Sequence, residues 1–185
     1  PLLGTESGNQ PFWSPDSASI GYNAGEGARQ IKRVGIVDGR IGVIAERNTL
    51  SAFWSTDGTV IFSQPDGLYR VDANGAGQPV KLAPTGQFPG GLPGGRFQYF
   101  EWVNSSRDTG LRFAGPGLST TLKFPSVQSN AVFAAGFLVF RQGSSLVAQP
   151  FDERALTFNG AQATLADGVS YNPANLRTMF GASAG

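Results

Sequence analysis

The sequence lacks two residue types that carry much of enzyme chemistry: none of its 185 residues is cysteine and none is histidine. Disulfides and cysteine-ligated zinc are therefore excluded, as are Ser-His-Asp triads and histidine-ligated metals. Charge is also scarce, because only 15% of residues are charged and the net charge is +1. Such a chain has no basic field to hold nucleic acid or an anionic membrane. No apolar run approaches the roughly 20 residues of a transmembrane helix.

Glycine and aromatic residues are abundant instead. The chain has 26 glycines, 12 prolines and 14 phenylalanines, and 40% of its residues are hydrophobic. So much glycine and proline argues against a helical bundle and favours many short elements joined by turns. The hydrophobic content is sufficient for a packed core. One weak helix-like patch lies at 175–180, and the remaining pattern is short alternating apolar runs.

An internal repeat sets the expected architecture. Phe12-Trp13-Ser14-Pro15-Asp16 recurs as Phe53-Trp54-Ser55-Thr56-Asp57, 41 residues later, and degenerate copies follow near Gly91 and Val132. A period near 40 residues is the blade length of a propeller with four strands per blade. The sequence therefore predicts an all-β fold, a β-propeller of four-stranded antiparallel blades in a single domain. The repeats are expected at about 6–46, 47–86, 87–127 and 128–170, with partial strands at 171–185 and 1–5.

The repeat motif has a structural interpretation. Asp16 and Asp57 stand where a tight hairpin needs a side-chain acceptor, although an aspartate could also be a metal ligand. Trp13 and Trp54 are flat, large side chains suited to fill the space between adjacent blades. The third repeat has Gly91 in the tryptophan position, and three aromatic residues of the next strand are expected to refill that gap: Tyr99, Phe100 and Trp102.

These residues resemble a known family. The stretches 4–22, 67–82 and 130–168, which contain the motif at 12–16 and Gly67-Leu68-Tyr69-Arg70-Val71-Asp72, are similar to TolB-like, WD-repeat-like β-propellers. The resemblance is greatest to propeller regions that follow the kinase domain in some bacterial serine/threonine kinases. It implies an extracytoplasmic sensor or interaction domain. The third repeat departs from the family, with Gly94-Gly95 where Asp-Gly is usual, and no kinase motif is present.

Polar residues gather at the starts of the predicted first strands, which in a propeller face the central channel. There they could line a water-filled channel, bind a protein segment or small ligand, or hold Ca²⁺ through oxygen atoms. The candidate ligand-binding residues are Asn9, Gln10, Asn48, Gln87, Ser129, Asn130 and Asn175. The candidate calcium ligands, by analogy with propeller lactonases and phosphotriesterases, are Glu6, Asn9, Glu46, Asn48 and Asn130.

Other groups are expected to serve as solvated surface or turn residues, with a chemical role as the alternative. The possible paired carboxylates are Glu101, Asp108, Asp152, Glu153 and Asp167. The basic cluster, which could form a phosphate or RNA patch, is Arg29, Lys32, Arg33 and Arg40. The possible nucleophiles are Ser55, Ser119 and Tyr171, and the possible bases for them are Lys32, Lys81 and Lys123.

Two functions remain open from the sequence. The first is a non-catalytic module that binds a protein segment or a small molecule, assembles as a homo-oligomer by strand sharing, and needs no cofactor. The second is a calcium-dependent hydrolase of esters, lactones or phosphotriesters, with the metal in the channel. Neither involves nucleic acid or a membrane.

Overall fold

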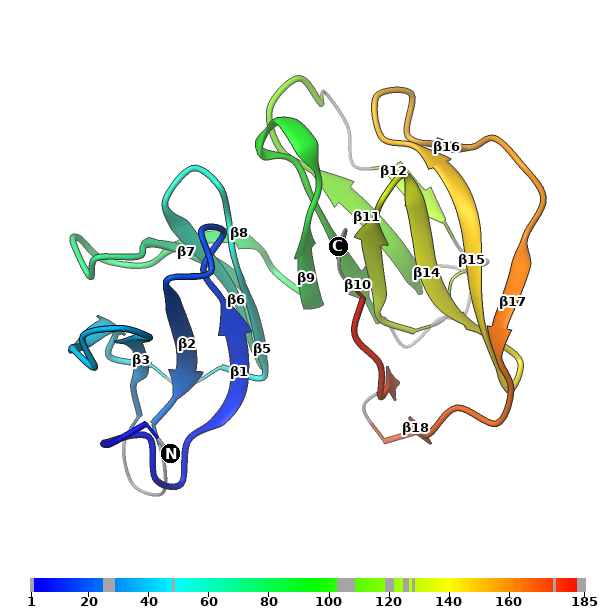
Figure 1. Cartoon of the computed structure of the whole chain (residues 1–185). Helices are drawn as coiled ribbons and strands as arrows, with labels where there is room; N and C mark the ends of the chain where they lie inside the picture. Colours follow the sequence, from blue (N-terminus) through cyan, green and yellow to red (C-terminus); the bar gives the residue numbers. More distant parts are fainter. Residues whose placement is uncertain are drawn as a thin grey trace. The chain divides into compact units, whose positions relative to one another are not determined.

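The computed structural model describes residues 2–24, 29–47, 49–102, 109–118, 122–124, 127, 129–174 and 176–182; of residues 122 and 123 it describes the backbone alone. The chain divides into two compact units, Pro1–Pro89 and Gly90–Gly185. Each unit is described separately. Figure 1 shows that both are built from short antiparallel strands.

Unit 1 holds two four-stranded antiparallel sheets with strands in chain order. Both follow from alternating apolar runs separated by turn formers such as Asp38-Gly39 and Asp66-Gly67. Sheet 1 consists of β1 (Asn9–Trp13), β2 (Ser19–Asn23), β3 (Ile31–Gly35) and β4 (Ile41–Ala45). Sheet 2 consists of β5 (Ser51–Trp54), β6 (Thr59–Gln64), β7 (Gly67–Asp72) and β8 (Val80–Ala83).

Two further antiparallel sheets follow along the chain. Sheet 3 consists of β9 (Gln87–Gly91), β10 (Phe97–Glu101), β11 (Gly110–Ala114) and β12 (Leu122–Phe124), with a short 3-10 turn, η1 (Pro93–Gly95), after β9. Sheet 4 consists of β13 (Ala131–Ala134), β14 (Phe137–Gln142), β15 (Ser145–Asp152) and β17 (Ala163–Ala166), and β16 (Thr157–Phe158) also pairs with β15. A two-stranded hairpin of β18 (Tyr171–Asn172) and β19 (Arg177–Thr178) comes last.

Each unit has its own core, formed where its apolar sheet faces meet. In unit 1, Phe12, Ile31 and Ile44 of sheet 1 pack with Val60 and Phe62 of sheet 2. The core of unit 2 is rich in phenylalanine and joins sheets 3 and 4. Its aromatic side chains, which meet in stacked and edge-to-face pairs, are Phe113, Phe124, Phe140, Phe151 and Phe158.

The all-β prediction is confirmed, since the described residues contain no α-helix and the four sheets have the expected antiparallel order. Two local expectations were wrong. The helix-like patch at 175–180 instead contributes β19. The outer strand expected at 1–5 is not formed, because residues 2–5 make turns and Gly4 accepts a hydrogen bond from the Tyr22 hydroxyl. No helix among the described residues has the length and apolar character needed to span a membrane.

The role predicted for Trp13 was also wrong. Its side chain is 59% exposed, whereas its neighbour Phe12 is 8% exposed and belongs to the core. A register irregularity between Asn9 and Phe12, with positive φ at Gln10, precedes the two aromatic residues. Phe12 is thereby turned inward, and its ring lies over Gly21, where an added Cβ would come within 2.2 Å of it. Trp54 behaves as expected and packs against this core, its ring centroid 6.4 Å from that of Phe12.

The aromatic residues expected to refill the gap at Gly91 divide between core and surface. Tyr99 and Phe100 are buried, but Trp102 is 58% exposed and was predicted wrongly. Trp102 comes directly after β10 ends at Glu101, so it lies beyond the part of the strand that packs. The buried residue next to Gly91 is Leu92, which joins the core of unit 2.

Candidate functional site

The two repeat aspartates lie in hairpin turns and accept hydrogen bonds there. The Ser14 hydroxyl donates to Asp16 Oδ1 over 2.6 Å, and the Ala18 N–H donates to the same oxygen over 3.0 Å. These donors, the Ser14 hydroxyl first, hold the pKa of Asp16 below its usual value. The carboxylate thus takes the place of a backbone acceptor within the turn between β1 and β2.

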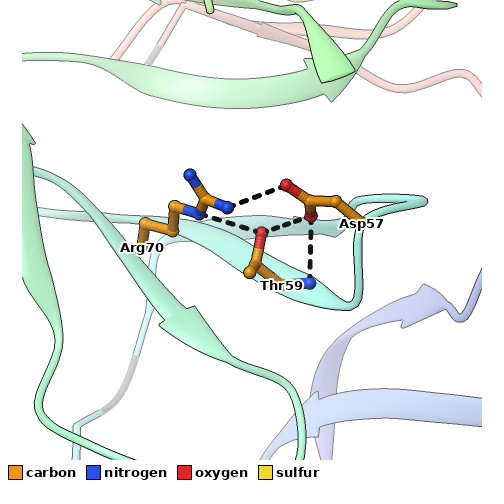
Figure 2. Close-up of polar contacts among 3 residues, drawn as sticks. All are labelled: Asp57, Thr59 and Arg70. Carbon is orange, nitrogen blue, oxygen red and sulfur yellow. Dashed lines mark hydrogen bonds and ion pairs between the residues drawn. The ribbon is translucent and has the colours of Figure 1, made fainter. Parts of the chain in front are cut away.

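Asp57 has an additional partner on a neighbouring strand (Figure 2). Its Oδ1 accepts from the N–H and the hydroxyl of Thr59, at 3.1 and 2.6 Å, and its Oδ2 lies 2.8 Å from Arg70 Nη2. Partial burial raises the pKa of Asp57, but hydrogen bonds from Thr59 and Ser55, together with the Arg70 charge, outweigh burial and leave that pKa below its usual value. The network joins the β5–β6 hairpin to β7.

We expect the Asp57→Asn variant to lose about 0.5–1 kcal/mol of unfolding free energy at pH 7, since both partners are partly solvated. A lowered native pKa means that the carboxylate stabilises the fold above its unfolded pKa. The contribution is lost as the pH falls below about 4, because the carboxylate then protonates. Urea denaturation of both proteins at pH 7 and pH 3 measures the difference. In an Arg70→Met background the cost of Asp57→Asn should shrink; an equal cost in both backgrounds and at both pH values contradicts the network.

Buried amide side chains link successive elements through the backbone. In unit 1, Asn23 of β2 donates to the Thr49 carbonyl over 2.6 Å and accepts from the Thr49 N–H over 2.9 Å. In unit 2, Asn130 makes the same pair of bonds with Thr178, at 3.1 and 2.7 Å. Each amide satisfies a backbone N–H and a backbone carbonyl of a buried residue later in the chain, so both are structural links.

Two further hydrogen bonds between a side chain and a backbone group also link separate strands. The Phe88 N–H donates to Ser51 Oγ over 2.8 Å, and Gln98 Nε2 of β10 donates to the Ala131 carbonyl of β13 over 3.1 Å. Gln98 is completely buried. Gly90 is required beside it, because an added Cβ would lie 2.4 Å from Gln98 Nε2. Asn23 and Gln98 were not among the predicted site residues, since they lie inside β2 and β10 rather than at the starts of the predicted first strands.

Several of the predicted ligand-binding residues are buried or already hydrogen-bonded within the protein, so they are not free to bind a ligand. Asn9 is exposed, and its Oδ1 accepts from Asn23 Nδ2 over 3.1 Å. Ser129 is buried, and its hydroxyl donates to the Asn130 carbonyl. Gln10 and Gln87 are half-buried within β1 and β9. Asn48 and Asn175 lie outside the described residues.

The described members of the predicted calcium set do not fit a calcium ion. Glu6 Oε1 accepts from the Gly4 N–H over 3.1 Å, and Glu46 accepts from the Gln30 amide at 3.1 and 2.9 Å. Both ends of the Asn130 amide are taken by Thr178. In the part of the chain that the structure describes, no three acidic side chains come together as a metal group would require. We derive no step through a metal.

The other predicted carboxylates also have local partners. Glu101 forms an ion pair with Arg112, and Asp167 accepts from the Ser145 hydroxyl. Asp152 accepts from the N–H groups of Ala155 and Arg154, which lower the pKa of Asp152. Glu153 lines a surface hollow together with Arg96 and Arg154, and Asp108 is outside the described residues.

The possible nucleophiles and bases are not brought together either. Ser55 is buried in the β5–β6 hairpin, and the Arg141 guanidinium lies 3.9 Å from the centre of the Tyr171 ring. Lys81 Nζ lies 3.6 Å from Asp66 Oδ2 in an ion pair, and Lys32 is a half-buried residue of β3. Ser119 and the side chain of Lys123 lie outside what the structure describes.

Two surface hollows are lined by arginine. The hollow in unit 2 has a volume of about 310 Å³ and lies between η1 and the turn after β15. Its lining residues are Pro93, Gly94, Arg96, Pro116, Glu153 and Arg154. Arg96 spans its base, donating to the carbonyls of Pro116, Glu153 and Arg154 at 3.2, 3.0 and 3.3 Å.

The hollow in unit 1 has a volume of about 340 Å³ and is formed by sheet 1 alone. It lies at the end of the strands where Ser19 pairs with Gly35, whereas Asn9 pairs with Asn23 at the other end. The basic cluster of the sequence therefore divides: Arg33 and Arg40 line the hollow, and Lys32 and Arg29 do not.

Comparison with known proteins shows similarity at the level of the fold. No protein-family model matches the chain, and no curated protein sequence matches it. Solved structures similar to it include regucalcin, a calcium-binding protein from Agrobacterium tumefaciens, with a TM-score of 0.56 and 16% identity over 89% of this chain and 60% of that one. A luciferin-regenerating enzyme gives a TM-score of 0.57 and 10% identity, covering 89% of this chain and 62% of that one. Puromycin hydrolase gives 0.58 and 14%, covering 83% of this chain and 28% of that one.

The chain thus spans about 60% of the first two of these structures. At such low identities the similarity concerns architecture rather than activity. With four antiparallel sheets, three of four strands and one of five, and with these neighbours, the chain has the β-propeller fold.

Proposed function

We propose that this chain is a non-catalytic binding module of a propeller, and that its unit 2 hollow binds a protein segment carrying an acidic group. The observation that supports this proposal most is that two arginine side chains, Arg96 and Arg154, lie at the same hollow. Arg96 is held in place by three backbone carbonyls. Arg154 is exposed at the rim of the same hollow. Two cations face one carboxylate there, so the lining carries a net positive charge.

The remaining lining fits a short peptide. Pro93 and Pro116 present apolar rings, and Gly94 has positive φ with no atom within 4 Å of a built Cβ, which leaves its backbone accessible. A volume near 310 Å³ accommodates one side chain and its flanking backbone rather than a large cofactor. Arginine binds a carboxylate through two parallel hydrogen bonds. We propose an acidic side chain or a C-terminal carboxylate as the group recognised.

A binding role also agrees with the carboxylates outside the hollow. The pKa values of Asp16, Asp57 and Asp152 are all lowered by hydrogen bonds within turns. General acid catalysis by a carboxyl group needs a raised pKa near the working pH. From the resemblance of the repeat motif to kinase-associated propellers, we further propose that binding serves a sensory role outside the cytoplasm.

The test is selection of a random peptide library on the immobilised chain, followed by affinity measurement of the enriched peptides. We expect enrichment of peptides with an aspartate, glutamate or free C-terminus, and at least about tenfold weaker binding to Arg154→Glu, since a charge-assisted hydrogen bond is worth more than 1.4 kcal/mol. Arg154 is chosen because its side chain is exposed at the rim, whereas the Arg96 guanidinium holds the turn through three backbone carbonyls.

The matched control is Arg29→Glu, which makes the same charge reversal at an exposed residue of unit 1. It should leave peptide affinity unchanged. The proposal fails if no peptide is enriched, or if Arg154→Glu and Arg29→Glu bind equally. It also fails if the purified chain turns over esters, lactones or phosphotriesters and loses that activity in Arg154→Glu.

A further inference from the structure

Arg33 occupies an unusual position in the middle strand pair of sheet 1. It pairs with Gly21 of β2 on one side and with Gly42 of β4 on the other. Cross-strand partners point to the same face of a sheet, so neither neighbour places a side chain beside the guanidinium. The Phe12 ring fills the space over Gly21, whereas the Arg33 side chain lies over Gly42, and both Arg33 and Gly42 line the hollow.

The Arg33 guanidinium has a buried donor without a partner. Its Nε is inaccessible to solvent and makes no hydrogen bond within the described part of the chain. Buried polar groups in folded proteins are normally hydrogen-bonded, and one that is not calls for an acceptor. Gly42 makes room for the Arg33 side chain, because an added Cβ would lie 3.2 Å from Arg33 Nε, and the guanidinium lies where Gly42 borders the hollow.

The charges around the hollow favour an anion. Asp38 is the acidic residue of the lining, and it is occupied: Oδ1 accepts from the Arg40 N–H over 3.0 Å, and Oδ2 lies 3.6 Å from Arg40 Nε. Arg33 has no ion pair with Asp38. The lining of Arg33, Arg40 and Asp38 therefore carries a net positive charge, and the Ser19 hydroxyl adds a neutral donor at the edge.

We propose that this hollow is a binding site for a phosphate-type oxyanion, held by the guanidinium of Arg33 with Arg40 and the Ser19 hydroxyl. The planar fork of an arginine matches two oxygens of a phosphate. The site is separate from the peptide hollow of unit 2 and does not depend on the function proposed there.

The experiment follows thermal unfolding of the whole chain as inorganic phosphate is raised, with ionic strength held constant by sodium chloride. A ligand that binds only the native state stabilises it by RT ln(1 + L/Kd), where L is the free ligand concentration, so the Tm rises as that concentration exceeds Kd. We expect a phosphate-dependent rise in Tm that sodium acetate does not reproduce. O-phosphoserine is a second probe: tighter binding than inorganic phosphate assigns a phosphate ester as the source, and weaker binding assigns the free ion.

Two variants test the residues. Arg33→Gln replaces the guanidinium by a shorter, neutral amide and should weaken phosphate binding by at least about tenfold, since a charge-assisted hydrogen bond is lost. Gly42→Ala should weaken it by crowding Arg33 Nε without changing the charge. Arg29→Gln is the matched control and should bind phosphate as the original chain does. A Tm that does not respond to phosphate, an equal response to acetate, or full binding by folded Arg33→Gln would overturn the proposal.

Discussion

Phe113→Ala is expected to lower the free energy of unfolding by about 3–5 kcal/mol, the range for phenylalanine truncation in a core. Phe113 is completely buried in unit 2. Its ring centroid lies 5.2 Å from that of Phe151 in a stacked pair and 5.2 Å from that of Phe124 in an edge-to-face pair. Alanine would remove both ring contacts and leave a cavity between sheets 3 and 4. Urea denaturation followed by circular dichroism measures the loss.

Two other variants keep this prediction testable if Phe113→Ala does not fold. Phe113→Leu retains most of the volume and should cost less than about 2 kcal/mol. Phe137→Ala truncates a phenylalanine that is 40% exposed. It should cost less than about 1.5 kcal/mol, because folding buries less of the apolar area of this side chain. If the Phe113 variants cost no more than Phe137→Ala, the aromatic cluster does not form the core of unit 2.

Asn23→Leu is expected to cost about 2–4 kcal/mol, because it leaves two buried backbone groups of Thr49 without partners. Leucine has the same branching as asparagine, with two methyl groups in place of the amide oxygen and nitrogen, so it removes the hydrogen bonds and adds some volume. Asn74→Ala is the matched control: Asn74 is exposed and accepts one bond from the Ala76 N–H, so its loss should cost less than about 1 kcal/mol. Urea denaturation of the three proteins compares them.

The Asn23→Asp variant separates the hydrogen bonds from shape. An ionised aspartate still accepts from the Thr49 N–H but repels the Thr49 carbonyl, so the native state raises the pKa of the new carboxyl. The destabilisation should therefore be greatest at pH 7 and disappear as the pH falls below the unfolded pKa, near 4, where the protonated acid donates like the amide. A cost that does not change with pH would show that the link to Thr49 is unimportant.

Local chemistry made much of the fold predictable. The Phe-Trp-Ser-x-Asp motif marks where a first strand turns into a second, and its period places all four sheets. The side-chain role of Asp57 follows from turn chemistry that acts over a few residues. What failed was the direction of individual side chains, as with Trp13, where one irregular residue pair in β1 exchanged the inner and outer faces.

The site was less predictable because its partners are distant in sequence. Whether the Asn130 amide is free for a ligand depends on Thr178, which lies 48 residues later. The hollow beside Arg33 depends on Gly21 and Gly42, each paired with it across a strand. A signal for this hollow was present, since each glycine interrupts a short apolar run, but the strand register was needed to place both beside an arginine.

The link between Asn23 and Thr49 has a consequence for how the protein is synthesised. Sheet 1 ends at Ala45, yet its buried amide finds its partners only when residue 49 has left the ribosome. The same holds for Asn130, which waits for Thr178. In both cases the buried amide waits for a residue made after sheet 1 or sheet 4, so folding on the ribosome should advance in steps that lag behind translation.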